Sequence, residues 1–133
     1  MTDTLQDDLG AVRHEAQRLL REQVHAERVE ALLDQPGSVD SALWQLVAEQ
    51  GWPAVALTEE QGGAGMGWAG LAVLQEELGQ AAAALPLAST ALVAAQLWAA
   101  AHPQAPAHWN TGLADGSLTA CLALGGLCAG SLT

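Results

Sequence analysis

The stretch "TEEQGGAGMGW", residues 58–68, holds four glycines and decides how the chain is organised. A dinucleotide-binding turn needs the pattern G-x-G-x-x-G, but the position that must hold the last glycine is Trp68. A Walker loop needs a lysine, and the chain contains none. The acids Glu59 and Glu60 would also repel a phosphate. We therefore interpret this stretch as a connection between two helices in which several glycines adopt positive φ.

The composition favours one helical domain. The chain has 133 residues, about the length of a single domain, and half of them are hydrophobic. The hydrophobic half is mostly alanine and leucine, which are strong helix formers. β-branched and aromatic residues, which strands favour, are scarce.

The charge distribution excludes a free-standing nucleic-acid-binding protein. The net charge is −11 at pH 7, and the four basic residues are all arginines within the first 28 positions. A nucleic-acid-binding protein needs a basic patch that displaces counterions from the phosphates. For the same reason we do not expect this segment to grip the phosphates of a large anionic ligand by itself.

Two stretches of the sequence bear on where in the cell the protein is located. Residues 1–8 are acidic and no apolar run follows them, so they do not resemble a signal peptide, and a cytoplasmic protein is expected. Residues 81–101 carry no charge over about the length that spans a bilayer. However, Pro86 and Gln96 interrupt this run and no basic residues flank it. We therefore predict a helix buried in a protein core and no membrane partner.

No metal site is predicted. Cys121 and Cys128 are the only cysteines, and without a cluster of histidines they fit neither a zinc site nor a disulfide framework. We expect both to be small buried hydrophobic residues. His102 and His108 lack carboxylate or cysteine neighbours that would complete a metal site.

Hydrophobic periodicity and helix-breaking residues divide the chain into four or five helices. Asp40 is suited to cap the start of a helix, and Gly51 and Gly79 are suited to end helices. Near the C-terminus "LTACLAL" reads as a single strand, which cannot form a sheet alone. The predicted fold is mainly α, an orthogonal or up-down bundle, with one C-terminal strand of a β-domain that lies elsewhere. The predicted helices span residues 3–33, 41–50, 68–78, 86–101 and 106–114, the strand spans 118–124, and the domains span 1–116 and 117–133.

The order of these motifs resembles the N-terminal helical domain of the flavin-dependent acyl-CoA dehydrogenases. The family pattern is a Gly-Trp-like pair, an extended Pro-Glu-Glu-like segment, a Gly-Gly-x-Gly loop and a helix that ends in Glu-Glu-Leu-Gly. Each motif alone is unspecific, but the ordered set is fairly specific and covers about residues 38–124. The matching residues are Gly51, Trp52, Glu59, Glu60, Gly62, Gly63, Gly65, Glu76, Glu77, Leu78 and Gly79.

The resemblance implies a protein of three parts: this helical domain, a middle β-barrel domain and a C-terminal four-helix bundle. FAD would bind between the last two domains and across a subunit interface. The catalytic base, a glutamate in most members, would lie in the C-terminal domain, and the reaction would convert an acyl-CoA thioester into a trans-2-enoyl-CoA. This chain is then expected to hold no catalytic residue. Its partners would be acyl-CoA, the missing domains or a partner subunit, within an oligomer.

The resemblance also implies a role for the helix after the Glu-Glu-Leu-Gly motif, which lines the far end of the acyl cavity in the family. Leu85, Ser89 and Val93 are the residues that would line the pocket. Their spacing of four places them on one helix face, although the same stripe is equally typical of an ordinary core. Small residues around Ser89 would leave room for a bulky or branched acyl group. Glu76 and Glu77 are adjacent, so they do not form an acid–base dyad, and at least one is expected to be a solvated helix-end charge or an interdomain contact.

The last residues depart from the family pattern. The family continues from its first strand into a Thr-Glu-Pro-Gly-x-Gly-Ser-Asp-like segment that contacts flavin and substrate, whereas here the strand leads to "GGLCAGSLT". Ser131 is the candidate cofactor-binding residue in this stretch. Either the flavin site is degenerate or the alignment fails here; degenerate half-sites are known in family members built from two unlike subunits. The alternative hypothesis is a non-catalytic helical subunit or interaction module that docks onto a complete flavoprotein.

Overall fold

The structure, a computed structural model, describes residues 2–100 and 106–121. All regular structure within these residues is helical, which confirms the predicted mainly α fold. The α-helices are α1 (Thr2–Gln23), α2 (Ala26–Leu33), α3 (Ser41–Glu49), α4 (Gly67–Gln80), α5 (Leu87–Ala100) and α6 (Ala107–Ala114). Two short 3-10 helices, η1 (Trp52–Ala54) and η2 (Glu59–Gln61), lie between α3 and α4.

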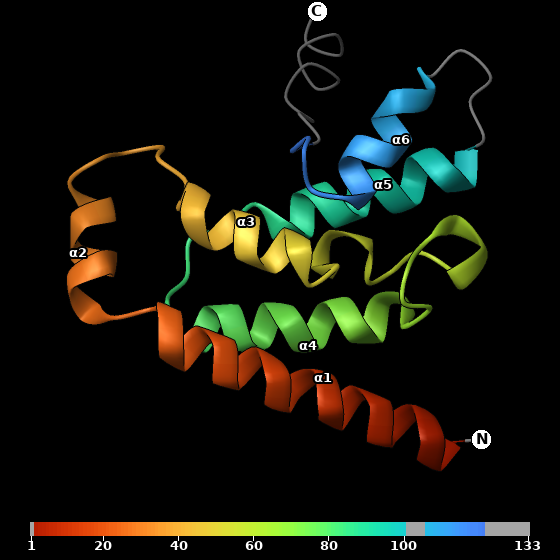
Figure 1. Ribbon diagram of the computed structural model, residues 1–133, viewed down its shortest axis with the longest axis horizontal. Helices are drawn as coiled ribbons and strands as arrows, with labels where there is room; N and C mark the ends of the chain where they lie inside the picture. Colours follow the sequence, from red (N-terminus) through yellow and green to blue (C-terminus); the bar gives the residue numbers. More distant parts are fainter. Residues whose placement is uncertain (1, 101–105, 122–133) are drawn as a thin grey trace, which may run out of the picture.

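The helices form three layers around one core (Figure 1). Helix α1 packs along α4 at the bottom of the view, and α3 crosses the middle. Helices α5 and α6 pack on each other and on η1 at the top. Helix α2 stands apart at one end of the molecule and contributes no buried residue.

The core is built mainly from leucine, with alanine, valine and tryptophan. Leu43, Trp44 and Val47 of α3 are buried, at the spacing expected of one helix face. Leu74 of α4 and Leu87 of α5 are fully buried and belong to the same cluster. The cluster joins α1, α3, α4, η1 and α5, and its members are Ala16, Leu19, Leu20, Leu43, Trp44, Val47, Trp52, Val55, Leu71, Leu74, Leu78, Leu87 and Ala91.

Helix α3 begins and ends where the sequence predicts. The Asp40 side chain accepts a hydrogen bond from the Leu43 N–H at 3.0 Å and so caps the first turn. Gly51 follows the helix in the left-handed conformation, with φ of +77°. Pro53 is at the start of η1, where a proline needs no N–H partner within the helix.

The prediction of one helix over residues 3–33 is wrong. The chain forms α1 and α2, and His25 between them is extended, with φ of −116° and ψ of 156°. Arg28 of α2 donates to the Gln23 carbonyl at the end of α1 (3.2 Å) and pairs with Asp40 (2.6 Å). Because no buried apolar face holds α2 in line with α1, this ion pair directs it toward the start of α3 instead.

The glycine-rich connection has the backbone conformation that the sequence predicts. Gly62, Gly65 and Gly67 have φ of +82°, +68° and +56°, a region that other residues enter only at a cost. Gly63 is needed for a different reason, because a Cβ there would lie 2.3 Å from the carbonyl oxygen of Leu57. The connection therefore folds back tightly on the segment before it.

Helix α4 does not end at Gly79 as predicted, because that glycine lies inside the helix. The end is set two residues later by a Schellman motif, in which the Ala83 N–H donates to the Leu78 carbonyl at 2.9 Å and the Ala82 N–H to the Gly79 carbonyl at 3.1 Å. Ala82 occupies the left-handed position, with φ of +54°, that glycine usually takes. No local signal in the sequence marks this end, since an alanine occupies the position.

An arginine joins the two long helices. Arg13 of α1 binds both acids at the end of α4: its guanidinium lies 2.5 Å from a Glu77 carboxylate oxygen and 2.7 Å from one of Glu76. Glu77 is 3% exposed, whereas Glu76 is 54% exposed and is the solvated helix-end charge expected of at least one of them. The pair therefore holds α1 against α4 within this domain.

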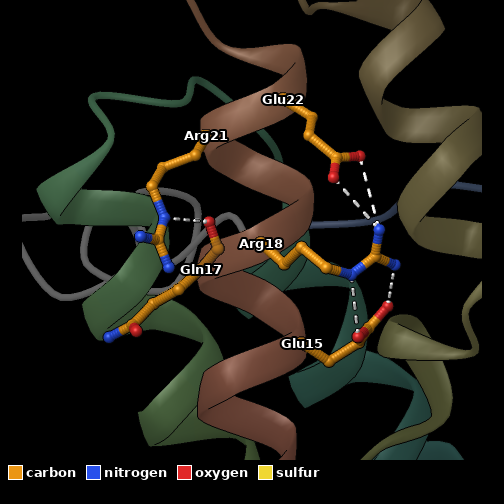
Figure 2. A network of polar contacts seen from close by, with 5 residues as sticks. All are labelled: Glu15, Gln17, Arg18, Arg21 and Glu22. Carbon is orange, nitrogen blue, oxygen red and sulfur yellow. Dashed lines mark hydrogen bonds and ion pairs between the residues drawn. The ribbon is translucent and has the colours of Figure 1, made fainter.

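A second arginine network lies on the solvent side of α1 (Figure 2). Arg18 pairs with Glu15 one turn before it and with Glu22 one turn after it, the latter at 3.1 Å, and Arg21 donates to the Gln17 carbonyl at 3.1 Å. The hydrogen bond from Arg18 lowers the pKa of Glu15 below its ordinary value. Exposed pairs of this kind add little to the stability of the fold.

Several predictions concern the end of the chain. Residues 118–121 have no regular structure, and the rest of the predicted strand 118–124 lies outside the described residues, so the strand and the domain boundary at 116/117 stay predictions. Cys121 is exposed, so the expectation that it is buried is wrong, and Cys128 lies outside the described residues. None of the helices in the described ranges is both long and apolar enough to cross a membrane.

Candidate functional site

Two of the three predicted pocket residues lie together on α5. Ser89 and Val93 are one helical turn apart and both are half-buried. Leu85 lies two residues before the helix begins, in the segment that joins α4 to α5, where it packs against the core cluster. The predicted spacing of four on one helix face therefore holds for Ser89 and Val93 and is wrong for Leu85.

The stripe lies beside the core face of α5. That core face is formed by Leu87, Thr90, Ala91 and Ala94, each at most 1% exposed. Ser89 and Val93 both lie beyond its Thr90 edge. The Ser89 hydroxyl donates to the Pro86 carbonyl at 3.2 Å within the first turn. A residue at the border of a core has one side packed and one side available, which is the position that a pocket wall requires.

The segment that follows α6 is tied to three helices, and sequence reasoning missed this feature. We name residues 115–120 the exit segment. The Trp44 indole N–H of α3 donates to the Gly116 carbonyl at 2.8 Å, and the Leu118 N–H donates to the Gly112 carbonyl of α6 at 2.8 Å. The Ala120 N–H donates to the Thr90 hydroxyl oxygen of α5 at 3.3 Å.

Close packing explains Gly116, and the Leu118 side chain lies close to Gly112. Gly116 has φ of +78°, and a Cβ there would lie 2.5 Å from the Ala48 Cβ. A Cβ on Gly112 would lie 2.7 Å from the Leu118 side chain. The residues "LADGS" predict only a turn, so its docking onto α3 is information that the sequence does not provide.

A cleft of ≈ 360 Å³ lies between α1 and α4, lined by Gln17, Leu20, Arg21, Val24, Glu77, Gln80 and Ala81. Another, of ≈ 560 Å³, lies between the glycine-rich connection and α6. Its charged lining residues are the acids Glu60 and Asp115, so the larger cleft is unsuited to a phosphate. A hydrogen bond from Ser117 lowers the pKa of Asp115, which keeps this carboxylate charged.

The cation distribution also limits what this domain binds. No Lys or Arg follows Arg28 in the sequence, and three of the four arginines pair with carboxylates. Within the described residues no three His, Cys, Asp or Glu side chains come together as a metal site would need. Ser131, the candidate flavin contact, lies outside the described residues.

A model of the family described as "Acyl-CoA dehydrogenase, N-terminal domain" matches residues 6–117. The chain belongs to the acyl-CoA dehydrogenase family. The resemblance inferred from the glycine-rich connection and its flanking motifs is thus confirmed.

Among acyl-CoA dehydrogenases, this chain is similar to IpdE2 from two organisms. It is 41% identical to the acyl-CoA dehydrogenase IpdE2 of Mycobacterium tuberculosis over 97 residues, which cover 72% of this chain and 30% of that protein. It is also 41% identical over 87 residues to IpdE2 of Mycolicibacterium smegmatis, covering 59% of this chain and 28% of that protein.

A solved structure of the family shares the fold. A variant of the Tcur3481-Tcur3483 steroid ACAD superposes with a TM-score of 0.72 at 30% sequence identity, covering 86% of this chain and 32% of that one. The chain therefore spans about a third or less of the length of these acyl-CoA dehydrogenases. The family match ends at Ser117, inside the exit segment.

Proposed function

We propose that this chain is the N-terminal helical domain of a flavin-dependent dehydrogenase that forms an α,β double bond in an acyl-CoA thioester. The match of the family model over residues 6–117, ending where the chain leaves the helices, is the observation that carries the proposal. FAD and the catalytic base belong to the parts of the protein that lie outside this chain. Assembly into an oligomer and a cytoplasmic location are predictions that follow from the same membership.

The part of the substrate that meets this domain is the far end of the acyl group. Ser89 and Val93 supply a half-buried surface on α5, and Leu85 borders it from the segment before the helix. The surrounding residues are small, and the similar solved protein is named a steroid ACAD. We infer an acyl group that carries a bulky ring system rather than a slender chain.

The test is a substitution that fills the proposed pocket. In the complete enzyme that contains this domain, Ser89→Leu is expected to lower kcat/KM for an acyl-CoA carrying a fused-ring group by roughly tenfold or more, because the added volume must be accommodated in a packed site. Activity on butyryl-CoA is expected to change little, since a short chain does not reach α5. Flavin absorbance and enoyl-CoA formation are measured together.

The matched control is Ala72→Leu, which adds the same side chain on the exposed face of α4. Equal losses with both acyl-CoA substrates, or equal losses in both variants, would contradict a wall formed by α5. A complete protein that binds flavin but forms no enoyl-CoA from any acyl-CoA would contradict the proposed reaction.

The second candidate function is a non-catalytic helical subunit that docks onto a complete flavoprotein. "GGLCAGSLT", which stands where the family has its flavin-contacting segment, favours it. The coding sequence after Thr133 separates the two functions. A continuing frame with a β-domain and a helical bundle bearing a glutamate base supports the enzyme, whereas a stop codon followed by co-purification with a flavoprotein supports the subunit.

A further inference from the structure

A threonine hydroxyl lies in the apolar core face of α5. Thr90 is 0% exposed, and its neighbours on that face are Leu87, Ala91 and Ala94. A buried hydroxyl without a partner destabilises a protein, so a polar residue at such a position needs a hydrogen bond. The Thr90 oxygen has one, because it accepts the Ala120 N–H at 3.3 Å.

This hydrogen bond reaches across the fold to the point where the chain leaves it. Thr90 and Ala120 are 30 positions apart, and Ala120 lies beyond the end of the family match at Ser117. Two earlier points of the exit segment are fixed by backbone and indole hydrogen bonds to Gly112 and Trp44. Thr90 thus supplies the most C-terminal of the hydrogen bonds that hold the exit segment.

The same residue lies beside the proposed pocket wall. Thr90 follows Ser89 directly and precedes Val93 by three positions, so the three side chains leave adjacent sectors of one helix. The side chain of Thr90 points into the core, while Ser89 and Val93 lie at its border. A shift of the exit segment relative to α5 therefore changes the distance between the pocket wall and whatever follows residue 121.

We propose that Thr90 is a positioning residue. Its buried hydroxyl fixes the end of the exit segment, where the next part of the protein starts, against α5. Because α5 also carries Ser89 and Val93, this contact sets the depth of the acyl pocket. We call the hydrogen bond between the Ala120 N–H and the Thr90 hydroxyl oxygen the tether. The tether is a feature of this chain, and only its effect on the acyl pocket rests on the proposed function. It also assigns a reason for a hydroxyl at this position, where valine would fill the same space.

The experiment compares three variants of the complete protein. Thr90→Val keeps the shape and removes the acceptor, Thr90→Ser keeps the acceptor, and Thr119→Val makes the same substitution on an exposed side chain next to Ala120. The first readout is hydrogen exchange at the Ala120 amide, which needs no activity. We expect about three- to tenfold faster exchange in Thr90→Val and parental rates in the other two variants.

The second readout is steady-state kinetics with an acyl-CoA that carries a fused-ring group. Thr90→Val is expected to raise KM with kcat little changed, and Thr90→Ser is expected to restore KM, because the chemistry lies elsewhere and only the fit of the acyl end changes. Unchanged exchange at Ala120 would overturn the tether. Faster exchange at Ala120 with an unchanged KM would overturn the role of Thr90 in the acyl pocket. If the parent protein does not oxidise any acyl-CoA, the proposed function is overturned. The exchange result still decides whether the tether exists.

Discussion

At the scale of single residues, Gly63 shows how closely the glycine-rich connection is packed. A Cβ on this residue would lie 2.3 Å from the Leu57 carbonyl oxygen and 2.5 Å from the Ala54 carbonyl oxygen. Both atoms are backbone atoms held by the fold, so neither can move as the end of a flexible side chain would. Only a residue without a Cβ fits at this position, and this allows residues 62–66 to fold back on η1.

We expect Gly63→Ala to destabilise the protein by about 1–3 kcal/mol or more, because the added methyl forces the two segments apart. Gly79→Ala is the matched control. Gly79 lies inside α4, and a methyl added there would meet no atom within 4 Å, so alanine is expected to stabilise by roughly 0.5–1 kcal/mol. Urea unfolding midpoints measure both changes, and shifts in the same direction would contradict the account.

At the scale of elements, the Arg28–Asp40 pair connects α2 to the start of α3. Asp40 is 8% exposed, caps α3 through the Leu43 N–H and accepts two hydrogen bonds from the Arg28 guanidinium. The hydrogen bond from Arg28, followed by that from Leu43, holds the pKa of Asp40 below its ordinary value despite the opposing effect of burial. One carboxylate therefore fixes both the direction of α2 and the first turn of α3.

The lowered pKa has a consequence for acid stability. Because Asp40 ionises more readily in the folded than in the unfolded chain, its contribution is fully present above about pH 4 and is lost as the pH falls through the folded-state pKa. Asp40→Asn keeps a capping oxygen but loses the charge, so we expect a loss of about 1–3 kcal/mol at pH 7. Urea unfolding from pH 7 to pH 2.5 should show the two proteins converging in stability at the acid end.

The exposed Asp34 provides a control, since Asp34→Asn removes a carboxylate of the same type just after α2. This variant should follow the parent across the pH range. If the free energies of unfolding of Asp40→Asn and the parent differ by a constant amount down to pH 2.5, the ion pair does not respond to protonation of Asp40.

The elements differ in how well the sequence predicts them. Helices α3, α5 and α6 agree with prediction to within a residue or two, because Asp40, Pro86 and the proline-rich stretch before α6 are local signals. The break at His25 and the motif that follows α4, with Ala82 as its left-handed residue, have no local signal. The first depends on an ion pair between residues 12 positions apart and the second on an alanine in a conformation typical of glycine.

At the scale of the whole molecule, apolar side chains remain exposed on α5, on α6 and in the exit segment. Leu92 of α5, Trp109 of α6 and Leu118 of the exit segment are 37%, 46% and 39% exposed. If the chain is one domain of a larger enzyme, we expect the part that continues from the exit segment to cover apolar surface of this kind. Burial of such surface on docking is favourable.

Trp109 and Trp68 permit a test in the complete protein. Their exposures in this domain are similar, 46% and 51%, but Trp109 lies on α6 near the exit segment and Trp68 lies in the first turn of α4. Hydroxyl-radical footprinting of the complete protein should oxidise Trp109 more slowly than Trp68, because the next domain covers α6. Equal rates, or faster oxidation of Trp109, would place that domain elsewhere.

The candidate site is only partly predictable from the sequence. Placing Ser89 and Val93 on one face needs only the helical period, and both lie on α5 one turn apart, whereas the position of Leu85 depends on where α5 begins. The exit segment escapes prediction because its anchors connect distant positions: Trp44 to Gly116 spans 72 residues. No local pattern in the sequence reports such a contact.

Because all the arginines lie in α1 and α2, trypsin cleavage can detect the local unwinding of these two helices. Trypsin cuts after Lys and Arg, so within this sequence every susceptible bond follows Arg13, Arg18, Arg21 or Arg28. A protease needs an extended substrate, and these bonds are helical, so a cut requires local unwinding. Cleavage after Arg28 reports the loosening of α2, and cleavage after Arg13 reports the release of α1 from Glu77 on α4. Limited digestion thus reads out the detachment of the N-terminal helices without any engineered label.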